Sequence, residues 1–147
     1  MSSIYNASDN AAILSRIESL KPESKALWGK MTVDQMLKHT NEAILIAFDE
    51  KTLKINFLMR FLGKMMKHKI FNSEFKKNSP TAPEFIFKEH YDFEAAKKDL
   101  TINFSRFAQG PEAIKITEHP FWGKMTSEDW DKLMWKHLDH HLKQFGV

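Results

Sequence analysis

The sequence predicts an all-α protein, a bundle of four long helices with an additional helical insertion between helices two and three. Apolar residues recur at helical spacing along almost the whole chain. Helix formers are plentiful, and only 5 Gly and 5 Pro interrupt them. The string WGKMT occurs twice, at 28–32 and 122–126, and each copy precedes a helical pattern. This repeat divides the chain into two similar halves of two helices each, which favours the bundle.

The two helices of the first half have clear boundaries. The first is predicted from about Ser8 to Leu20, before a proline. The second begins after Thr32, whose hydroxyl can cap the first turn, and Gln35 stands at the position that a capping box requires. We expect this second helix to extend to about Phe48.

The insertion between the halves carries an apolar stripe within residues 53–71, formed by Phe57, Leu58, Phe61, Leu62, Met65 and Met66. It predicts one or two helices wedged between the main ones, followed by a surface loop over 72–87. The third main helix is predicted over 92–109 and the last over 127–146, with Thr126 as its cap and Asp129 completing an approximate capping box.

Length and composition place all 147 residues in a single domain. The chain has no Cys, which excludes disulfides, thiolate metal sites and a cysteine nucleophile. No apolar run is long enough for a signal peptide or a membrane span. We therefore expect a soluble, cytoplasmic protein that has no membrane partner.

Positive charge is concentrated in one segment. Lys51 to Lys77 contains seven Lys and one Arg against the single acid Glu74, a net charge of +7 in a chain of net +3. Such a segment is either a solvated helix face or a surface for an anionic partner, substrate or membrane. No nucleic-acid-binding motif accompanies it, so we expect no nucleic-acid partner.

A pair of histidines points into the predicted bundle. His137 and His141 are four residues apart and therefore share one face of the last helix. Trp130, Met134 and Phe145 lie on the same face, so that the pair projects into an apolar interior. A buried imidazole costs free energy unless its nitrogens find partners, and a divalent metal is one such partner for two neutral imidazoles.

A third histidine can join this pair. His39 lies two turns into the second helix. If the repeat places this helix opposite the last one, His39 can supply a third ligand, and three His ligands leave positions open for water or substrate. Spacing alone leaves the alternative that these histidines are ordinary core or surface residues.

Three further polar residues admit two interpretations each. His119, which opens the motif HPFWG, either bonds nearby backbone or lies at a pocket mouth. Glu42, one turn beyond His39, is either a solvated or supporting carboxylate or a general base. Gln35 either caps its helix or lines the pocket.

The segments WGKMTVDQMLKH and HPFWGKMTSEDWDKLMWKHLDHHLKQFG resemble the DinB/YfiT-like superfamily, and within it domain-of-unknown-function family 1569. The resemblance implies a DinB-like four-helix bundle over residues 1–147. It also implies a divalent metal held by one His of the second helix and an HxxxH pair of the last. Those positions are His39, His137 and His141 in this sequence.

The same resemblance implies a metalloenzyme. Zinc or nickel is the expected metal, and a low-molecular-weight thiol is the expected co-reactant, as in transferases and isomerases of the superfamily. We predict a thiol-dependent transferase or a hydrolase for a small-molecule substrate, in a pocket walled by Trp130, Met134 and Phe145. A homodimer is also expected. The alternative is a non-catalytic metal-binding or dimerising interaction module.

Overall fold

The all-α prediction is confirmed by a computed structural model, which describes residues 2–147. Five α-helices dominate the fold: α1 (Ala7–Ser19), α2 (Val33–Ala47), α3 (Phe57–Phe71), α4 (Phe93–Ser105) and α5 (Ser127–Gln144). Three short 3₁₀ helices follow α3 or α4: η1 (Pro83–Phe85), η2 (Arg106–Gln109) and η3 (Pro111–Ala113). None of the helices formed by these residues combines the length and the apolar character that a membrane crossing requires.

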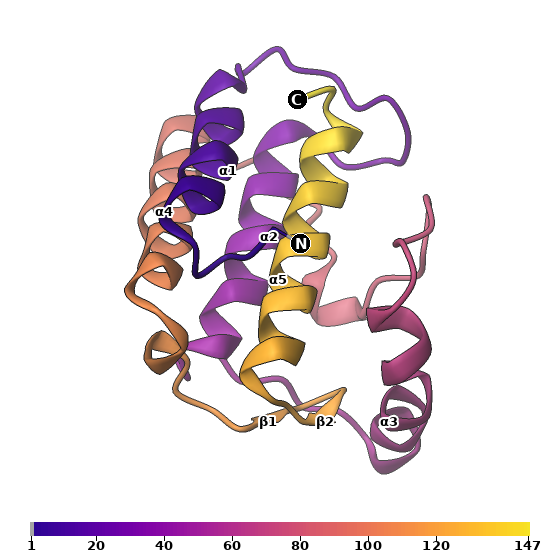
Figure 1. The fold of residues 1–147 in the computed structure, drawn as a ribbon. Helices are drawn as coiled ribbons and strands as arrows, with labels where there is room; N and C mark the ends of the chain where they lie inside the picture. Colours follow the sequence, from indigo (N-terminus) through magenta and orange to yellow (C-terminus); the bar gives the residue numbers. More distant parts are fainter. Residues whose placement is uncertain (1) are drawn as a thin grey trace.

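Helices α1, α2, α4 and α5 pack around one core (Figure 1). Helix α4 lies against both α1 and α2, and α5 contacts both α1 and α2. Apolar residues at helical spacing from all four helices are fully or almost fully buried there, among them Ile13, Ile17, Met36, Leu37, Leu100, Phe104, Leu138 and Leu142. The arrangement places α2 beside α5, the two helices that follow the WGKMT copies.

Both WGKMT copies form the turn before a helix. Thr32 and Thr126 are the N-caps of α2 and α5, and the side-chain oxygen of Gln35 accepts a hydrogen bond from the Thr32 amide at 3.1 Å. Gly29 and Gly123 both adopt positive φ, at 80° and 73°, which L-residues with a Cβ rarely adopt. The repeat is therefore a structural device for starting helices, as the sequence predicts.

The predicted end of the third main helix is four residues late. Helix α4 stops at Ser105, and the next four residues tighten into η2 before Gly110, whose φ is 106°. The linker after it contains two short antiparallel strands that sequence periodicity did not predict, β1 (Glu118–His119) and β2 (Gly123–Lys124). Two-residue strands are too short to show an alternating pattern.

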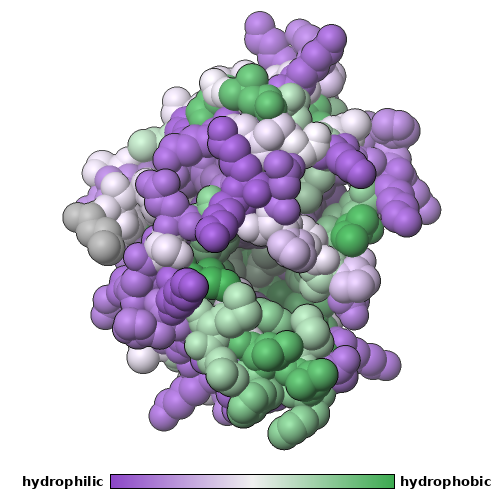
Figure 2. Space-filling view, turned by 90° about the vertical axis from the view of Figure 1, so that its right-hand side faces the viewer, coloured by the Kyte–Doolittle hydropathy of each residue, from purple (hydrophilic) through white to green (hydrophobic). Residues whose placement is uncertain are grey.

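Helix α3 lies outside the set of four helices, beside β2 and α5 (Figure 1). The prediction that its apolar stripe wedges between the main helices is wrong. Phe57 is 85% exposed and Met65 is 66% exposed, and the stripe forms an apolar surface in Figure 2. The opposite side of α3 carries Gly63 and Phe71, which are buried.

Candidate metal centre

Helices α2 and α5 bring the three predicted histidines together. One nitrogen from each of His39, His137 and His141 lies within 4.8 Å of the other two. The Nε2 atoms of His39 and His137 are 2.9 Å apart, and the ring centroids of the three residues are 4.8 to 4.9 Å from one another. His39 and His141 are buried, so the cluster lies inside the fold.

The protonation state of His39 follows from its backbone partner. Its Nδ1 lies 3.1 Å from the carbonyl oxygen of Phe85, in η1. A carbonyl oxygen can only accept, so Nδ1 carries the proton and donates it. In the neutral ring Nε2 then holds a lone pair, and this is the nitrogen that faces His137.

The orientation of His141 is fixed by a relay through Gln144. The side-chain Nε2 of Gln144 donates to the carbonyl oxygen of Trp28 at 2.8 Å, which assigns the other amide atom as oxygen. That oxygen lies 2.8 Å from Nδ1 of His141 and accepts its proton. The lone pair of His141 is therefore on Nε2, as it is in His39.

This donor set fits a divalent cation. Metal-binding histidines characteristically donate their other ring N–H to a carbonyl or carboxyl group, as His39 and His141 do here. Two ligand nitrogens around a tetrahedral zinc ion lie roughly 3.3 Å apart when each bond is about 2.0 Å. The His39–His137 separation of 2.9 Å is close to this value, whereas the limit of 4.8 Å for the whole set means that the rings would draw together around a bound ion.

All three rings are held in the neutral form. Burial lowers the pKa of His39, lowers that of His137 well below its usual range, and lowers that of His141 to about 3. The neighbouring imidazoles lower the pKa of His137 and His141 further, because two positive rings would repel each other. Neutral imidazole is the form that binds metal, so the lone pairs are available at pH 7.

The family described as "Protein of unknown function (DUF1569)" matches residues 4–146, nearly the whole chain. The chain belongs to the DUF1569 family. The matched range includes α2 and α5 and therefore all three histidines. No curated protein and no solved structure matches this DUF1569 chain.

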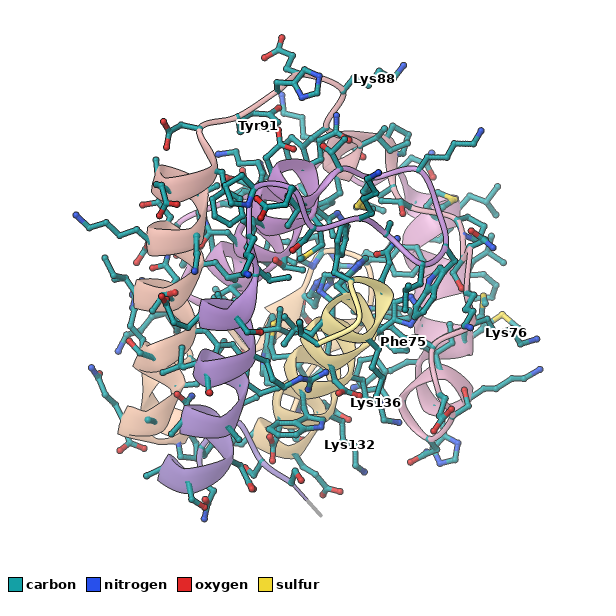
Figure 3. All side chains as sticks on the ribbon, turned by 90° about the horizontal axis from the view of Figure 1, so that it is seen from above. Phe75, Lys76, Lys88, Tyr91, Lys132 and Lys136 are labelled. Carbon is teal, nitrogen blue, oxygen red and sulfur yellow. The ribbon has the colours of Figure 1, made fainter. Side chains whose placement is uncertain are left out.

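Two aromatic neighbours of the DUF1569 cluster were not predicted from the sequence. Trp130, Met134 and Phe145 are buried in the core. Two phenylalanine rings beside the imidazoles come from outside the main helices. Phe85 lies 5.9 Å from His39, and Phe75 lies 6.4 Å from His137 (centroid distances). Phe75 belongs to the segment after α3, and Figure 3 shows it beside α5.

Glu42 is not part of the cluster. Within residues 2–147, the group of potential metal ligands at this place consists of the three histidines. The carboxylate of Glu42 pairs with Lys38 at 2.7 Å and with Lys51 at 2.5 Å. Both oxygens of the Glu42 carboxylate are thus held by lysines, which favours the first of its two interpretations over a general base.

His119 and Gln35 also have structural roles. The Nδ1 of His119 accepts hydrogen bonds from the backbone amides of Phe121 and Trp122, at 3.0 and 3.3 Å, within the turn that joins β1 to β2. Gln35 caps α2 and donates to the carbonyl oxygen of Glu89 at 3.2 Å. Each residue follows the first of its two interpretations.

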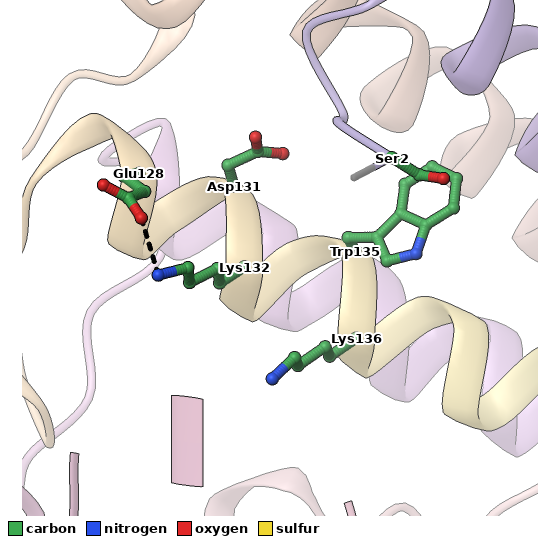
Figure 4. A pocket seen from close by; sticks show the side chains of 6 residues that line it. All are labelled: Ser2, Glu128, Asp131, Lys132, Trp135 and Lys136. Carbon is green, nitrogen blue, oxygen red and sulfur yellow. Dashed lines mark ion pairs between the residues drawn. The ribbon is translucent and has the colours of Figure 1, made fainter. Parts of the chain in front are cut away.

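Two surface cavities lie away from the histidines. One, of about 80 Å³, is lined by Ser2 and by residues of α5, and an ion pair of 2.6 Å between Glu128 and Lys132 lies at its edge (Figure 4). The other, of about 460 Å³, lies between residues 22–26, the start of α2 and His90. None of the three clustered histidines lines either cavity.

Sequence reasoning missed two partners of the cluster. Gln144 follows His141 by three residues and so lies on the same side of α5, a spacing from which it could have been found. The carbonyl of Phe85 is 46 residues from His39 along the chain, and no sequence pattern connects them.

Proposed function

We propose that this DUF1569 protein is a metal-dependent enzyme of the DinB/YfiT-like type, with a DinB-like four-helix bundle that holds one divalent ion through His39, His137 and His141. One observation carries the proposal. Three neutral imidazoles converge inside the fold, and two of them have their Nδ1 protons committed to Phe85 and Gln144. These two rings therefore carry their lone pairs on Nε2, and Nε2 of His39 lies 2.9 Å from Nε2 of His137, a distance that a shared cation or an N–H···N bond between the rings explains.

Three imidazoles suit zinc or nickel and leave further coordination positions for water or substrate. A cation bound there would supply Lewis acidity, which makes a water molecule or a thiol nucleophilic near neutral pH. The chain contains no Cys, so any reacting thiol belongs to a low-molecular-weight cofactor or to the substrate. The proposed reaction is therefore a thiol-dependent transfer or a hydrolysis that acts on a small molecule.

The residues around the cluster have separate parts in this proposal. The Phe85 carbonyl and Gln144 hold two rings in the tautomer that presents Nε2. His140 is half-buried, with its ring 5.3 Å from that of His141 and 6.1 Å from Phe75. Trp28 meets His140 edge-on at 5.8 Å. Phe75 and Trp28 thus offer apolar contacts to a partly apolar substrate that approaches beside His140.

Elemental analysis of the untagged protein tests the site. We expect close to one metal ion per chain, and we expect His137→Ala to lose it while the circular dichroism spectrum stays helical. His68→Ala, at an exposed position of α3, is the matched control and should keep the metal. Unchanged metal content in His39→Ala, His137→Ala and His141→Ala would refute the assignment.

The alternative is a non-catalytic metal-binding or dimerising module, which the exposed apolar side of α3 favours. The coordination sphere of the metal-loaded protein separates the two functions. An exchangeable position that a small thiol or water occupies supports the enzyme. A sphere completed by a fourth protein ligand supports the module.

A further inference from the structure

The outward side of α3 is covered by seven large apolar side chains, which we call the α3 apolar face. They are between 40% and 85% exposed: Phe57, Leu58, Met59, Phe61, Leu62, Met65 and Met66. Figure 2 shows them gathered on one side of the molecule. Soluble monomers rarely expose a continuous apolar area of this size unless it has a function.

The inward side of α3 fixes this orientation. Lys67 pairs with Asp129 at 2.6 Å, and Arg60 pairs with Glu118 at 2.6 Å. Gly63 lies so close to the backbone of Phe121 that a Cβ at this position would collide with its carbonyl group. The helix therefore docks through its small and charged residues. Turning the apolar face inward would break both ion pairs and the close backbone contact.

The area of the α3 apolar face matches the need of a stable dimer. A large side chain exposes on the order of 200 Å² when fully solvated, so seven of them at these exposures present roughly 800 Å². A typical protein–protein interface buries about 800 Å² on each partner. One further copy of this chain could cover the face completely.

The composition of the face favours a protein partner. Interface cores are enriched in aromatic residues and Met and depleted in Lys, which agrees with the Phe and Met residues here. A helix that lies on an anionic membrane needs free Lys and Arg beside its apolar face. In α3, Arg60 and Lys67 are already held in intramolecular ion pairs, which leaves Lys64 and Lys69 as its exposed lysines.

We propose that the α3 apolar face is the interface of a homodimer, in which the α3 helices of two copies pack against each other about a two-fold axis. A symmetric contact uses the same patch on both copies, so a single self-complementary face is sufficient. The homodimer that the family resemblance implies would form through α3. It does not depend on the metal centre, because none of the three clustered histidines lies on α3.

Sedimentation velocity over a range of micromolar concentrations tests the interface. We expect a species of twice 17.2 kDa for the wild type and of 17.2 kDa for Phe61→Glu. Ile102→Glu is the matched control, because Ile102 and Phe61 are both 51% exposed and Ile102 lies on α4. This control should remain dimeric.

Three outcomes would overturn the interface: a monomeric wild type, a Phe61→Glu variant that remains dimeric, or an Ile102→Glu variant that becomes monomeric. Sedimentation of a monomeric wild type with phosphatidylserine vesicles would assign the face to a membrane instead. Metal content is measured on the same samples. Phe61→Glu should keep the metal of the wild type, so a failure of the dimer is distinguishable from a failure of the metal site.

Discussion

A single side chain, that of Gln144, connects the histidine cluster to the first WGKMT copy. It accepts from His141 and donates to the carbonyl of Trp28. Gly29 makes this possible, because a Cβ at that position would collide with the amide nitrogen of Gln144. The glycine of the repeat therefore permits a close backbone approach, and this approach orients one ring of the cluster.

Gln144→Leu should weaken metal binding by about 10- to 100-fold, because the Nδ1 proton of His141 loses its acceptor and the ring is no longer held in one tautomer. Gln144→Glu should bind metal much more tightly than Gln144→Leu, since a carboxylate still accepts from His141. Competition with a chromophoric chelator measures the affinities. Lys143→Leu, at the exposed neighbouring position, controls for changes in α5. Equal affinities of Gln144→Leu and the wild type would contradict this role.

At the scale of elements, α3 shows what helical periodicity leaves open. The stripe of apolar residues predicts one or two amphipathic helices, and a single helix forms over Phe57–Phe71. Periodicity does not say which side of a helix meets the rest of the protein. In α3 that choice rests on Gly63 and two ion pairs, whose partners lie 58 and 62 residues away along the chain.

The variant Gly63→Ala should show whether the stability of α3 depends more on intrinsic helix propensity or on the packing of α3 against Phe121. In an isolated helix, Ala is more favourable than Gly by about 1 kcal/mol. Here the new methyl group would meet the backbone of Phe121, so we expect the free energy of unfolding to fall by about 1–3 kcal/mol. Amide hydrogen exchange in α3 should accelerate at the same time. His68→Ala, at an exposed position of α3 outside the apolar face, should change both quantities little, and a gain of stability in Gly63→Ala would refute the contact.

At the scale of the whole molecule, buried histidines make stability depend on pH. His119 is a buried histidine outside the candidate metal-site cluster. Burial lowers its pKa to about 4, and its Nδ1 can accept from two backbone amides only while unprotonated. An unfolded histidine has a pKa of about 6.5. Between pH 6.5 and 4 the unfolded chain therefore binds a proton at His119 that the folded chain does not, and stability falls as the pH is lowered.

His119 alone should reduce the free energy of unfolding by about 2 kcal/mol between pH 7 and pH 5. Chemical denaturation with a chelator present measures this change without a contribution from metal. His119→Asn keeps an acceptor near the position of Nδ1 but does not titrate. It should therefore lose less stability on acidification than the wild type, and an equal loss in both proteins would show that His119 does not contribute.

Much of the fold could be predicted because its signals are local. The starts of α2 and α5 follow directly from Thr32 and Thr126, whose capping groups act within three residues. The end of α4 was less predictable. Gly110 marks where the helical segment stops, but the last turn before it tightens into η2. Strands β1 and β2 are defined by their pairing with each other. The residue pattern within one segment cannot predict a contact with another segment.

Some residues of the candidate site could be predicted from local sequence, and others could not. His137 and His141 share a helix face because of their spacing, so their proximity is a property of α5 alone. His39 joins them only because α2 packs beside α5, which required the internal repeat and a family resemblance to foresee. The acceptor for His39 comes from η1, a turn in a segment predicted only as a surface loop.

The sequence by itself determined the helical class, the capped starts of α2 and α5, and the three imidazoles that can serve as ligands. Hydrogen bonds within a turn and the 3.6-residue period act over a few residues, so they are readable from one segment. Tertiary structure alone decided that His39 meets the pair on α5 and that α3 turns its apolar side outward. Which faces meet is set by the free energy of packing the whole chain, to which distant residues such as Phe121, Asp129 and Phe85 contribute.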